Sequence, residues 1–243
     1  MLPDVLVVGA GILGVSIAYH LSEIGKARVV VIDERCLSAG ATGRSGALVR
    51  ANYENRADTQ LALMSLEIFR SWKDRIGGQC GFKPFGHMEI AGRKSFASFG
   101  GLIKQQRQWG VDIDLIDSVE AKARSPRLRL ERSDELIAYH GSAGACDPNT
   151  TNRTLDDAAR ARGVGFIFHE PVRSLVIGPA RAIGVRTDKR TIAAGSLVLA
   201  TGAWTNQILA PLGLDFGFVT RLSRIAVFRP HEFDDGEAFP TIL

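Results

Sequence analysis

The sequence predicts an α/β protein of two domains, and three observations predict this fold class. An apolar run of strand length, residues 5–8, leads into a glycine-rich turn that is followed by a helical pattern. A second β-branched run, residues 28–32, ends next to an acidic residue. Strand and helix patterns alternate again after residue 147. We therefore expect an α/β domain that is interrupted by a second, α+β domain.

The glycine-rich turn has the spacing Gly-x-Gly-x-x-Gly, at Gly9, Gly11 and Gly14. The first glycine permits a tight turn, the second lets the backbone approach a pyrophosphate, and the third lets the helix pack on the strand. The N–H groups and dipole at the start of that helix favour a phosphate. Asp33 follows the third glycine by 19 residues and is placed to accept hydrogen bonds from ribose hydroxyls, which argues against a 2′-phosphate.

These features predict a Rossmann-like dinucleotide site, and an ordinary glycine-rich β–α turn is the structural alternative. The predicted site comprises Gly9, Ala10, Gly11, Ile12, Leu13, Gly14, Asp33, Glu34 and Arg35.

Composition indicates a globular protein with a solvated surface. The chain has 243 residues, of which 45% are hydrophobic and 23% charged, with a net charge of +4. Basic residues are scattered and no run combines them with aromatic residues, so we expect no nucleic-acid partner. The apolar run near the N-terminus is too short for a transmembrane segment and has no basic residues before it.

The three cysteines, Cys36, Cys80 and Cys146, are far apart and lack the spacing of a disulfide framework or a zinc site. We therefore expect no metal site and a reducing compartment, the cytoplasm.

Helical periodicity is strongest between residues 58 and 76. Leu61, Met64, Ile68 and Trp72 recur at steps of three and four residues, with Leu66 and Phe69 alongside. This pattern predicts an amphipathic helix whose apolar face packs into the core.

Other elements follow from local patterns of strand and helix residues. A helix is expected to start near Pro148 and to end before Gly163. Another helix is expected over residues 94–110, and strands over 86–91, 136–140, 165–169, 172–177, 182–187, 196–200 and 216–228. We expect one domain to comprise residues 1–82 and 147–215, and the second to comprise residues 83–146 and 216–243.

Four motifs together resemble the D-amino-acid-oxidase-like FAD-dependent oxidoreductases, especially sarcosine oxidase of the β-subunit type and the glycine- and proline-oxidising flavoproteins. They are the glycine fingerprint, the small-residue loop 40–46, the helix start Asp147-Pro148, and the strand end Ala200-Thr201-Gly202-Ala203-Trp204. The resemblance implies FAD as the cofactor and a substrate domain built on a mainly antiparallel sheet. It also assigns FAD contacts to Gly40, Ala41, Thr42, Gly43, Arg44, Ser45, Gly46, Val172, Ala200, Thr201, Gly202 and Trp204.

The same resemblance implies a site for a small amino-acid or secondary-amine substrate at Arg50 and Tyr53, and His87, near the start of the expected substrate domain, is a further candidate for this site. A guanidinium presents two parallel N–H donors that suit a carboxylate. The alternatives are a surface salt bridge for Arg50 and a purely structural role for His87. The implied reaction oxidises a C–N bond to an imine and passes two electrons to FAD, so it requires no catalytic side chain.

Members of the resembled family continue well beyond the position that matches Leu243, and their additional residues complete the substrate domain. From this difference we expect the chain to be a fragment, a truncated product or one half of a split enzyme, and to form an oligomer or bind a partner subunit. Three functions stay open: an FAD-dependent amine oxidoreductase, a non-catalytic FAD-binding subunit, and an NAD-dependent dehydrogenase. The last is disfavoured by residues 40–46 and 200–204.

Overall fold

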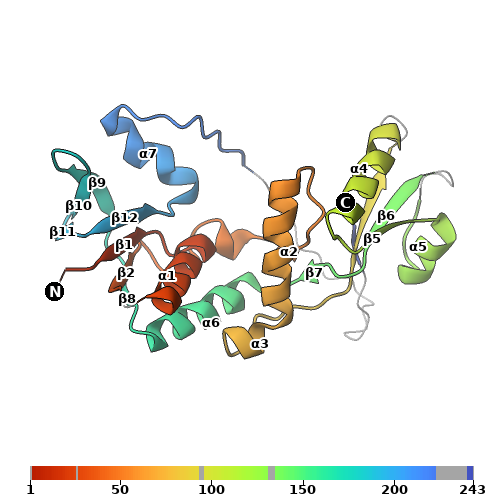
Figure 1. The fold of residues 1–243 in the computed structure, drawn as a ribbon, viewed down its shortest axis with the longest axis horizontal. Helices are drawn as coiled ribbons and strands as arrows, with labels where there is room; N and C mark the ends of the chain where they lie inside the picture. Colours follow the sequence, from red (N-terminus) through yellow and green to blue (C-terminus); the bar gives the residue numbers. More distant parts are fainter. Residues whose placement is uncertain (1, 26, 93–95, 131–134, 223–239, 243) are drawn as a thin grey trace. The chain divides into compact units, whose positions relative to one another are not determined.

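The computed structural model describes residues 2–25, 27–92, 96–130, 135–222 and 240–242. The chain divides into two compact units (Figure 1). The first unit comprises residues 1–45, 76–80 and 148–225, and the second comprises residues 46–75, 81–147 and 226–243.

The first unit is built on a parallel sheet with the strand order β12-β1-β2-β8. Its strands are β1 (Val5–Val8), β2 (Val29–Ile32), β8 (Gly165–Ile167) and β12 (Ser196–Leu199). Strand β1 pairs in parallel with both neighbours, so that Val5 lies opposite Val29 on one side and Ser196 on the other. The helices α1 (Ile12–Ile24) and α6 (Pro148–Ala161) contact each other. Short β-branched runs that alternate with helices favour this arrangement because parallel strands need crossover connections.

An antiparallel sheet packs against the parallel sheet within the same unit. It has the order β11-β10-β9, with β9 (Val172–Ile177), β10 (Ala182–Thr187) and β11 (Thr191–Ala193). Leu6, Val8 and Ile32 of the parallel sheet share one buried apolar cluster with Val185 of β10. After β12 the chain forms the short helical segments η3 (Gly202–Trp204), α7 (Thr205–Leu209) and η4 (Ala210–Leu212).

The second unit is built on a sheet with the order β13-β4-β6-β5. Its strands are β4 (His87–Ala91), β5 (Ile113–Ile116), β6 (Leu136–His140) and β13 (Thr241–Ile242), and only the β13–β4 pair is parallel. The expected mainly antiparallel sheet is therefore present. A small antiparallel pair joins β3 (Leu48–Val49) to β7 (Gly144–Ala145).

The two faces of this sheet carry different residues because side chains alternate along each strand. One face forms an apolar cluster with α4 (Phe96–Gln108) and with Ala62 and Leu63 of α2 (Arg56–Arg70). The other face packs Met88 and Ile137 against Ala121 of α5 (Ser118–Arg124). The Asn55 side chain caps α2 by accepting the Asp58 N–H at 2.9 Å. The four-residue helix α3 (Trp72–Arg75) follows α2.

Residues 46–75 were predicted to lie in the first domain, whereas the structure groups them with the second unit. The reason is that Ala62 and Leu63 pack against the apolar cluster on the sheet of the second unit. The predicted apolar face of the helix is also wrong in part, because Leu61 and Met64 are exposed whereas Thr59 and Leu66 are buried. Apolar residues occur around much of the circumference of α2, and the face that packs into the core is the one that carries residues 59, 62, 63 and 66.

The expected strand over residues 216–228 is wrong for its described part. Residues 216–222 have no regular secondary structure, and residues 223–228 lie outside the described residues. The alternation of Phe216 and Phe218 made this segment resemble a strand, but both side chains are largely exposed.

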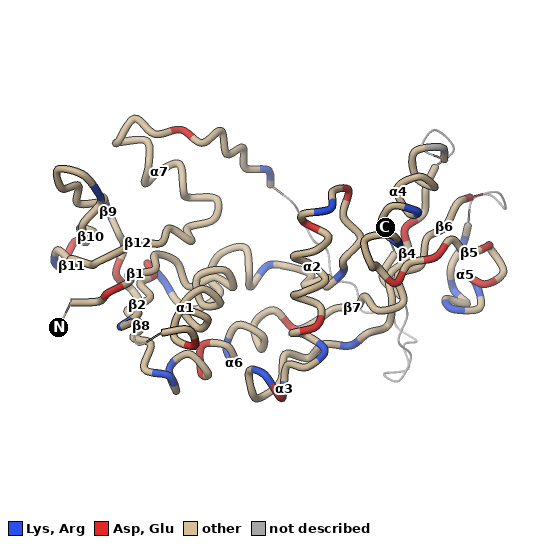
Figure 2. Tube along the Cα trace, in the orientation of Figure 1, with Lys and Arg blue, Asp and Glu red and all other residues tan. Residues whose placement is uncertain are grey.

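Figure 2 shows acidic and basic residues interspersed along the chain in both units, in agreement with a solvated surface. No helix within the described residues is long and apolar enough to cross a membrane. Cys36 is exposed, Cys80 is buried and Cys146 is half-buried.

Candidate dinucleotide site and substrate cluster

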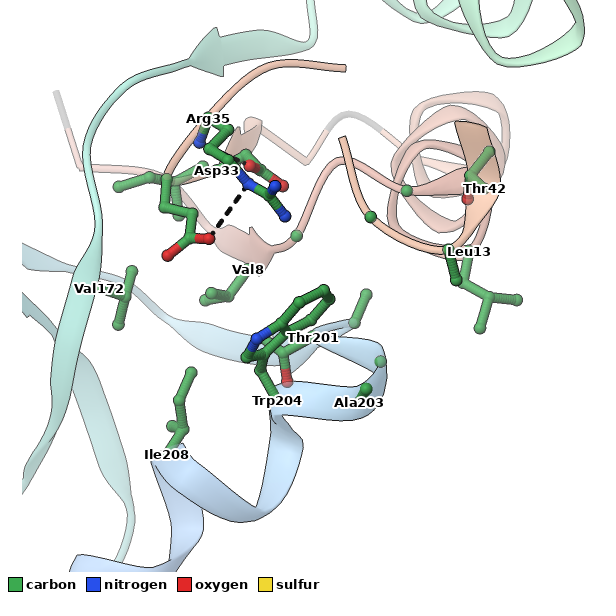
Figure 3. Close-up of a pocket in the computed structure, with 18 of the residues that line it drawn as sticks. Val8, Leu13, Asp33, Arg35, Thr42, Val172, Thr201, Ala203, Trp204 and Ile208 are labelled. Atoms are coloured by element: carbon green, nitrogen blue, oxygen red, sulfur yellow. Dashed lines mark hydrogen bonds and ion pairs between the residues drawn. The ribbon is translucent and has the colours of Figure 1, made fainter. Parts of the chain in front are cut away.

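A pocket of about 570 Å³ opens at the carboxyl ends of β1, β2 and β12 in the first unit (Figure 3). Ligands bind at this edge of open parallel sheets where the connections diverge from a central strand. Sixteen predicted cofactor residues line the pocket: Gly9, Gly11, Ile12, Leu13, Asp33, Glu34, Arg35, Gly40, Ala41, Thr42, Ser45, Val172, Ala200, Thr201, Gly202 and Trp204.

The glycine turn has the geometry that its spacing predicts. Gly9 has a φ of +111°, a conformation that side chains rarely adopt, and a Cβ there would overlap the Ala200 carbonyl oxygen. A Cβ at Gly14 would overlap the carbonyl oxygen of Gly9, so this glycine sets the close contact between α1 and the turn. The start of α1 consequently faces the pocket through Gly11, Ile12 and Leu13.

Asp33 anchors the turn with both carboxylate oxygens. Oδ2 accepts the Ala10 N–H at 2.8 Å, and Oδ1 accepts the Arg35 N–H at 2.8 Å. A carboxylate has about four lone-pair sites, so each oxygen keeps capacity for a further donor such as a ribose hydroxyl. Asp33 is half-buried at the rim of the pocket.

Thr42 connects the loop after β2 to the start of α1. Its Oγ1 accepts the Ile12 N–H at 3.0 Å, within the short helical turn η1 (Thr42–Arg44). A Cβ at Gly43 would lie 3.0 Å from Oδ1 of Asn149, so α6, which carries Asn149, packs closely against this loop. The loop is therefore held against both helices, which fixes the backbone that lines the pocket.

Trp204 lies in the pocket with the guanidinium of Arg35 5.7 Å from the centroid of its ring (Figure 3). Arg35 also pairs with Glu34 at 3.3 Å. A Cβ at Gly40 would lie 3.3 Å from the Trp204 ring, so the loop needs a small residue there. The indole is 39% exposed and can contact a flat ring from the open side of the pocket.

Five predicted cofactor residues do not line the pocket. Ala10 and Gly14 belong to the glycine turn and make the internal contacts described above. Gly43 packs against Ser38 and Asn149, Arg44 is exposed, and Gly46 belongs to the second unit.

Several residues of the site were not predicted from the sequence. Asn152 of α6 is fully buried, and its Nδ2 donates to the Ala10 carbonyl at 3.1 Å and to Ser38 Oγ at 2.9 Å, so it joins the glycine turn to the following loop. An asparagine on the same helical face as Leu155 and Ala159 could have indicated this role. The other unpredicted lining residues, which have no local motif, are Val8, Ile32, Pro171, Arg173, Ala203, Gln207 and Ile208.

The predicted substrate residues lie in the second unit. The guanidinium of Arg50 lies 4.8 Å from the centroid of the Tyr53 ring, and its Nη1 donates to the Asn52 carbonyl at 2.5 Å. Within the described residues, Arg50 forms no ion pair with a carboxylate. The surface salt bridge that the sequence left open for Arg50 is therefore not found in this part of the chain.

His87 is buried rather than open to solvent, with 1% of its surface exposed. Its Nδ1 lies 2.8 Å from Thr241 Oγ1, and it pairs across the sheet with His140, which is fully buried. Burial lowers the pKa of His87 to about 4, and the charge of Arg50 adds to this effect. Burial likewise lowers the pKa of His140 to about 4, although Asp112 opposes it. Both histidines are consequently neutral at pH 7.

The parallel sheet, the glycine turn and the pocket at the carboxyl ends of the strands define a Rossmann-type dinucleotide-binding protein. The family model described as "DAO: FAD dependent oxidoreductase" matches residues 4–241. The chain therefore belongs to the DAO family of FAD-dependent oxidoreductases, and the resemblance on which the FAD prediction rests is confirmed.

Similar proteins have names consistent with this family. The chain is 28% identical over 249 residues to peroxisomal sarcosine oxidase of Homo sapiens, a match that covers 99% of this chain and 61% of that protein. It is 30% identical to monomeric sarcosine oxidase of Streptomyces avermitilis, with 88% of this chain and 55% of that protein covered. The chain thus spans a little over half the length of these curated relatives.

Solved structures agree with the fold. L-proline dehydrogenase from P. horikoshii superposes with a TM-score of 0.81 at 28% identity, over 88% of this chain and 56% of that one. Glycine oxidase from Geobacillus kaustophilus has a TM-score of 0.76 at 21% identity, over 88% of this chain and 59% of that one, and supports the fold alone.

Proposed function

We propose that the chain binds FAD in the pocket of the first unit and belongs to an enzyme that oxidises the C–N bond of a small amino acid or secondary amine, of the sarcosine, glycine or proline type, to an imine. The pocket is the observation that carries this proposal, because its glycine turn, helix start and acidic rim are suited to an adenine dinucleotide. The names of the sarcosine oxidases and of L-proline dehydrogenase support the substrate class.

The residues present fit FAD. A side chain at Gly9 or Gly14 would overlap backbone atoms, so these two glycines permit the tight turn, and Gly11, which lines the pocket, presents no side chain to a pyrophosphate. The start of α1 would face that pyrophosphate, and Asp33 would accept the adenosine ribose hydroxyls. Val172 and Trp204 would line the adenosine side of the pocket.

FAD, when bound, supplies the acceptor for a hydride equivalent. The residues of the chain would hold the substrate and limit its orientation. Arg50 would bind the substrate carboxylate with two N–H donors, and the Tyr53 ring beneath the guanidinium would fix the plane of that fork. In this assignment the first unit holds the cofactor and the second recognises the substrate.

An absorption spectrum of the purified chain tests the proposal. The spectrum would be recorded after addition of FAD and removal of unbound FAD, and then without oxygen in the presence of sarcosine, glycine or L-proline. Retention of a flavin band that bleaches with one of these compounds supports amine oxidation. A flavin band that none of them bleaches favours the hypothesis of a non-catalytic FAD-binding subunit. A chain that retains no FAD contradicts the proposal.

Trp204 is expected to report FAD binding. Because its ring lies in the pocket, bound FAD should quench its emission, whereas Trp72 and Trp109 lie in the second unit. A fluorescence titration of the unmodified protein and the Trp204→Phe variant measures this effect. The variant should lose the largest share of the quenching, and equal quenching in both proteins would show that Trp204 does not line the FAD site.

Asp33→Asn is expected to weaken FAD binding by about tenfold to a hundredfold, since an asparagine offers only one acceptor oxygen and directs an amide N–H₂ toward a backbone donor. Equilibrium dialysis with FAD measures the change. The matched control is Asp114→Asn, which removes an exposed ion pair with Arg107 and should leave FAD affinity unchanged. Equal affinities of Asp33→Asn and the unmodified protein would exclude the ribose contact.

A further inference from the structure

We propose that Asn52 and Glu89 extend the Arg50 site so that it recognises both charged groups of a zwitterionic α-amino acid, with the carboxylate on Arg50 and the ammonium on Glu89 and Asn52. This inference rests on the proposed function, because it adds to Arg50 the residues that would select an amine in the same ligand.

Asn52 connects the two charged residues directly. Its backbone carbonyl accepts the Arg50 guanidinium at 2.5 Å, and its side-chain Nδ2 donates to Glu89 Oε2 at 2.9 Å. Glu89 lies on β4 opposite Ala138, on the face of the sheet that packs against Leu63 of α2. Asn52 thus hydrogen-bonds the cationic Arg50 through its backbone and the anionic Glu89 through its side chain, and all three residues belong to the second unit.

Both charges lack an ionic partner among the described residues. Neither Arg50 nor Glu89 takes part in an ion pair there, although both are partly buried. Partly buried charges are stabilised by opposite charges and by hydrogen bonds. A ligand with one negative and one positive group would satisfy both residues at once.

Asn52 also has a free acceptor beside Glu89. Its side chain is 3% exposed, and Oδ1 has no hydrogen-bond partner among the described residues. The contact of Nδ2 with a carboxylate fixes the orientation of the amide, so Oδ1 can act only as an acceptor. A buried acceptor without a donor is unfavourable, and an ammonium N–H would satisfy it.

The two buried histidines of this sheet add no charge to this pattern. His87 lies two residues before Glu89 on the same face of β4 and is neutral at pH 7, as is His140 opposite it. Arg50 and Glu89 are thus left as one cation and one anion, which matches the charges of an α-amino acid. A carboxylic acid that lacks an amine would use only Arg50.

Isothermal titration of the purified, FAD-supplemented chain with two probes tests the proposal. Sarcosine carries both charges, whereas methoxyacetate has the same shape with an ether oxygen in place of the ammonium. The unmodified protein should bind sarcosine about tenfold or more tightly than methoxyacetate, because charge-assisted hydrogen bonds are the stronger ones. Equal affinity for both probes would overturn the proposal without any variant.

Two substitutions then separate this inference from the proposed function. Glu89→Gln removes the charge but keeps an acceptor for Asn52, so it should weaken sarcosine binding about tenfold and leave methoxyacetate binding unchanged. Arg50→Gln should weaken the binding of both probes. The control Glu67→Gln, on the exposed face of α2, should change neither.

The outcomes have distinct meanings. If Arg50→Gln weakens both probes while Glu89→Gln changes neither, the proposed function stands and the zwitterion site is overturned. The zwitterion site is also overturned if Glu89→Gln weakens both probes equally, because that result indicates a structural role. If Arg50→Gln changes neither probe, the carboxylate assignment in the proposed function fails.

Discussion

Replacing Gly14 with alanine is expected to destabilise the first unit and to weaken FAD binding strongly. A Cβ at this position would overlap the carbonyl oxygen of Gly9, and backbone atoms cannot rotate away as a flexible side chain could. Overpacking of this kind destabilises proteins by about 1–3 kcal/mol, and here it would also push α1 away from the turn that faces the pocket. Urea denaturation and an FAD titration of the same preparation measure both effects.

Gly101→Ala provides a control with the opposite sign. Gly101 is an exposed residue within α4, and a Cβ there would meet no atom within 4 Å. Alanine is the better helix former, so this substitution should stabilise the protein by up to about 1 kcal/mol. If Gly14→Ala were as stable as Gly101→Ala and bound FAD normally, the close packing of α1 on the glycine turn would be disproved.

The protein is expected to lose stability as the pH falls from about 6.5 to about 4, through His87 and His140. Both have a pKa near 4 in the folded chain because they are buried, whereas an unfolded histidine has a pKa near 6.5. The unfolded state therefore binds protons first, and the free energy of unfolding decreases through this window. The loss is at most about 3 kcal/mol for each histidine. Arg50 opposes protonation of both histidines, Arg70 opposes it at His140, and Asp112 favours it at His140.

Chemical denaturation between pH 7 and pH 5 tests this expectation. In this range the histidines dominate the pH dependence, because carboxylates with lowered pKa values, such as Glu170, change the free energy of unfolding chiefly below their unfolded pKa of 4.5. His140→Leu should reduce the pH dependence by about half. At pH 7 it should be tolerated, since neither ring nitrogen of His140 has a hydrogen-bond partner among the described residues. His20→Gln, at an exposed position, is the control. An unfolding free energy that is constant from pH 7 to pH 5 would contradict the expectation.

Much of the fold was predictable because its signals are local. The strands β6, β9 and β10 have the predicted bounds, and α6 starts at Pro148 as its sequence indicates. The face of α2 was not predictable, because apolar residues occur around much of that helix and the choice depends on contacts with a distant sheet. The strand β5 and the helix α5 have weak local patterns and were not predicted.

The candidate site likewise has one part that the local sequence predicts and another that depends on contacts between distant residues. The glycine turn and Asp33 are encoded within residues 9–33, so their spacing alone located them. The contact of Arg35 with Trp204 and the bridge from Asn152 to Ala10 join residues that are remote in sequence. Glu89 had no motif, and only its hydrogen bond with Asn52 relates it to Arg50. The expected cytoplasmic location and the oligomer or partner subunit stay predictions.

The central position of β1 has a consequence for the order in which the chain folds. Val5 pairs with Ser196, which is nearly two hundred residues later, and the sheet of the second unit is encoded between these two residues except for β13. During synthesis the first strand must therefore wait, with one edge unpaired, until β12 leaves the ribosome. Pairings of such long sequence separation fold slowly because the intervening chain must first be ordered. The sheet of the second unit, whose β4, β5 and β6 lie within residues 87–140, can assemble in the meantime.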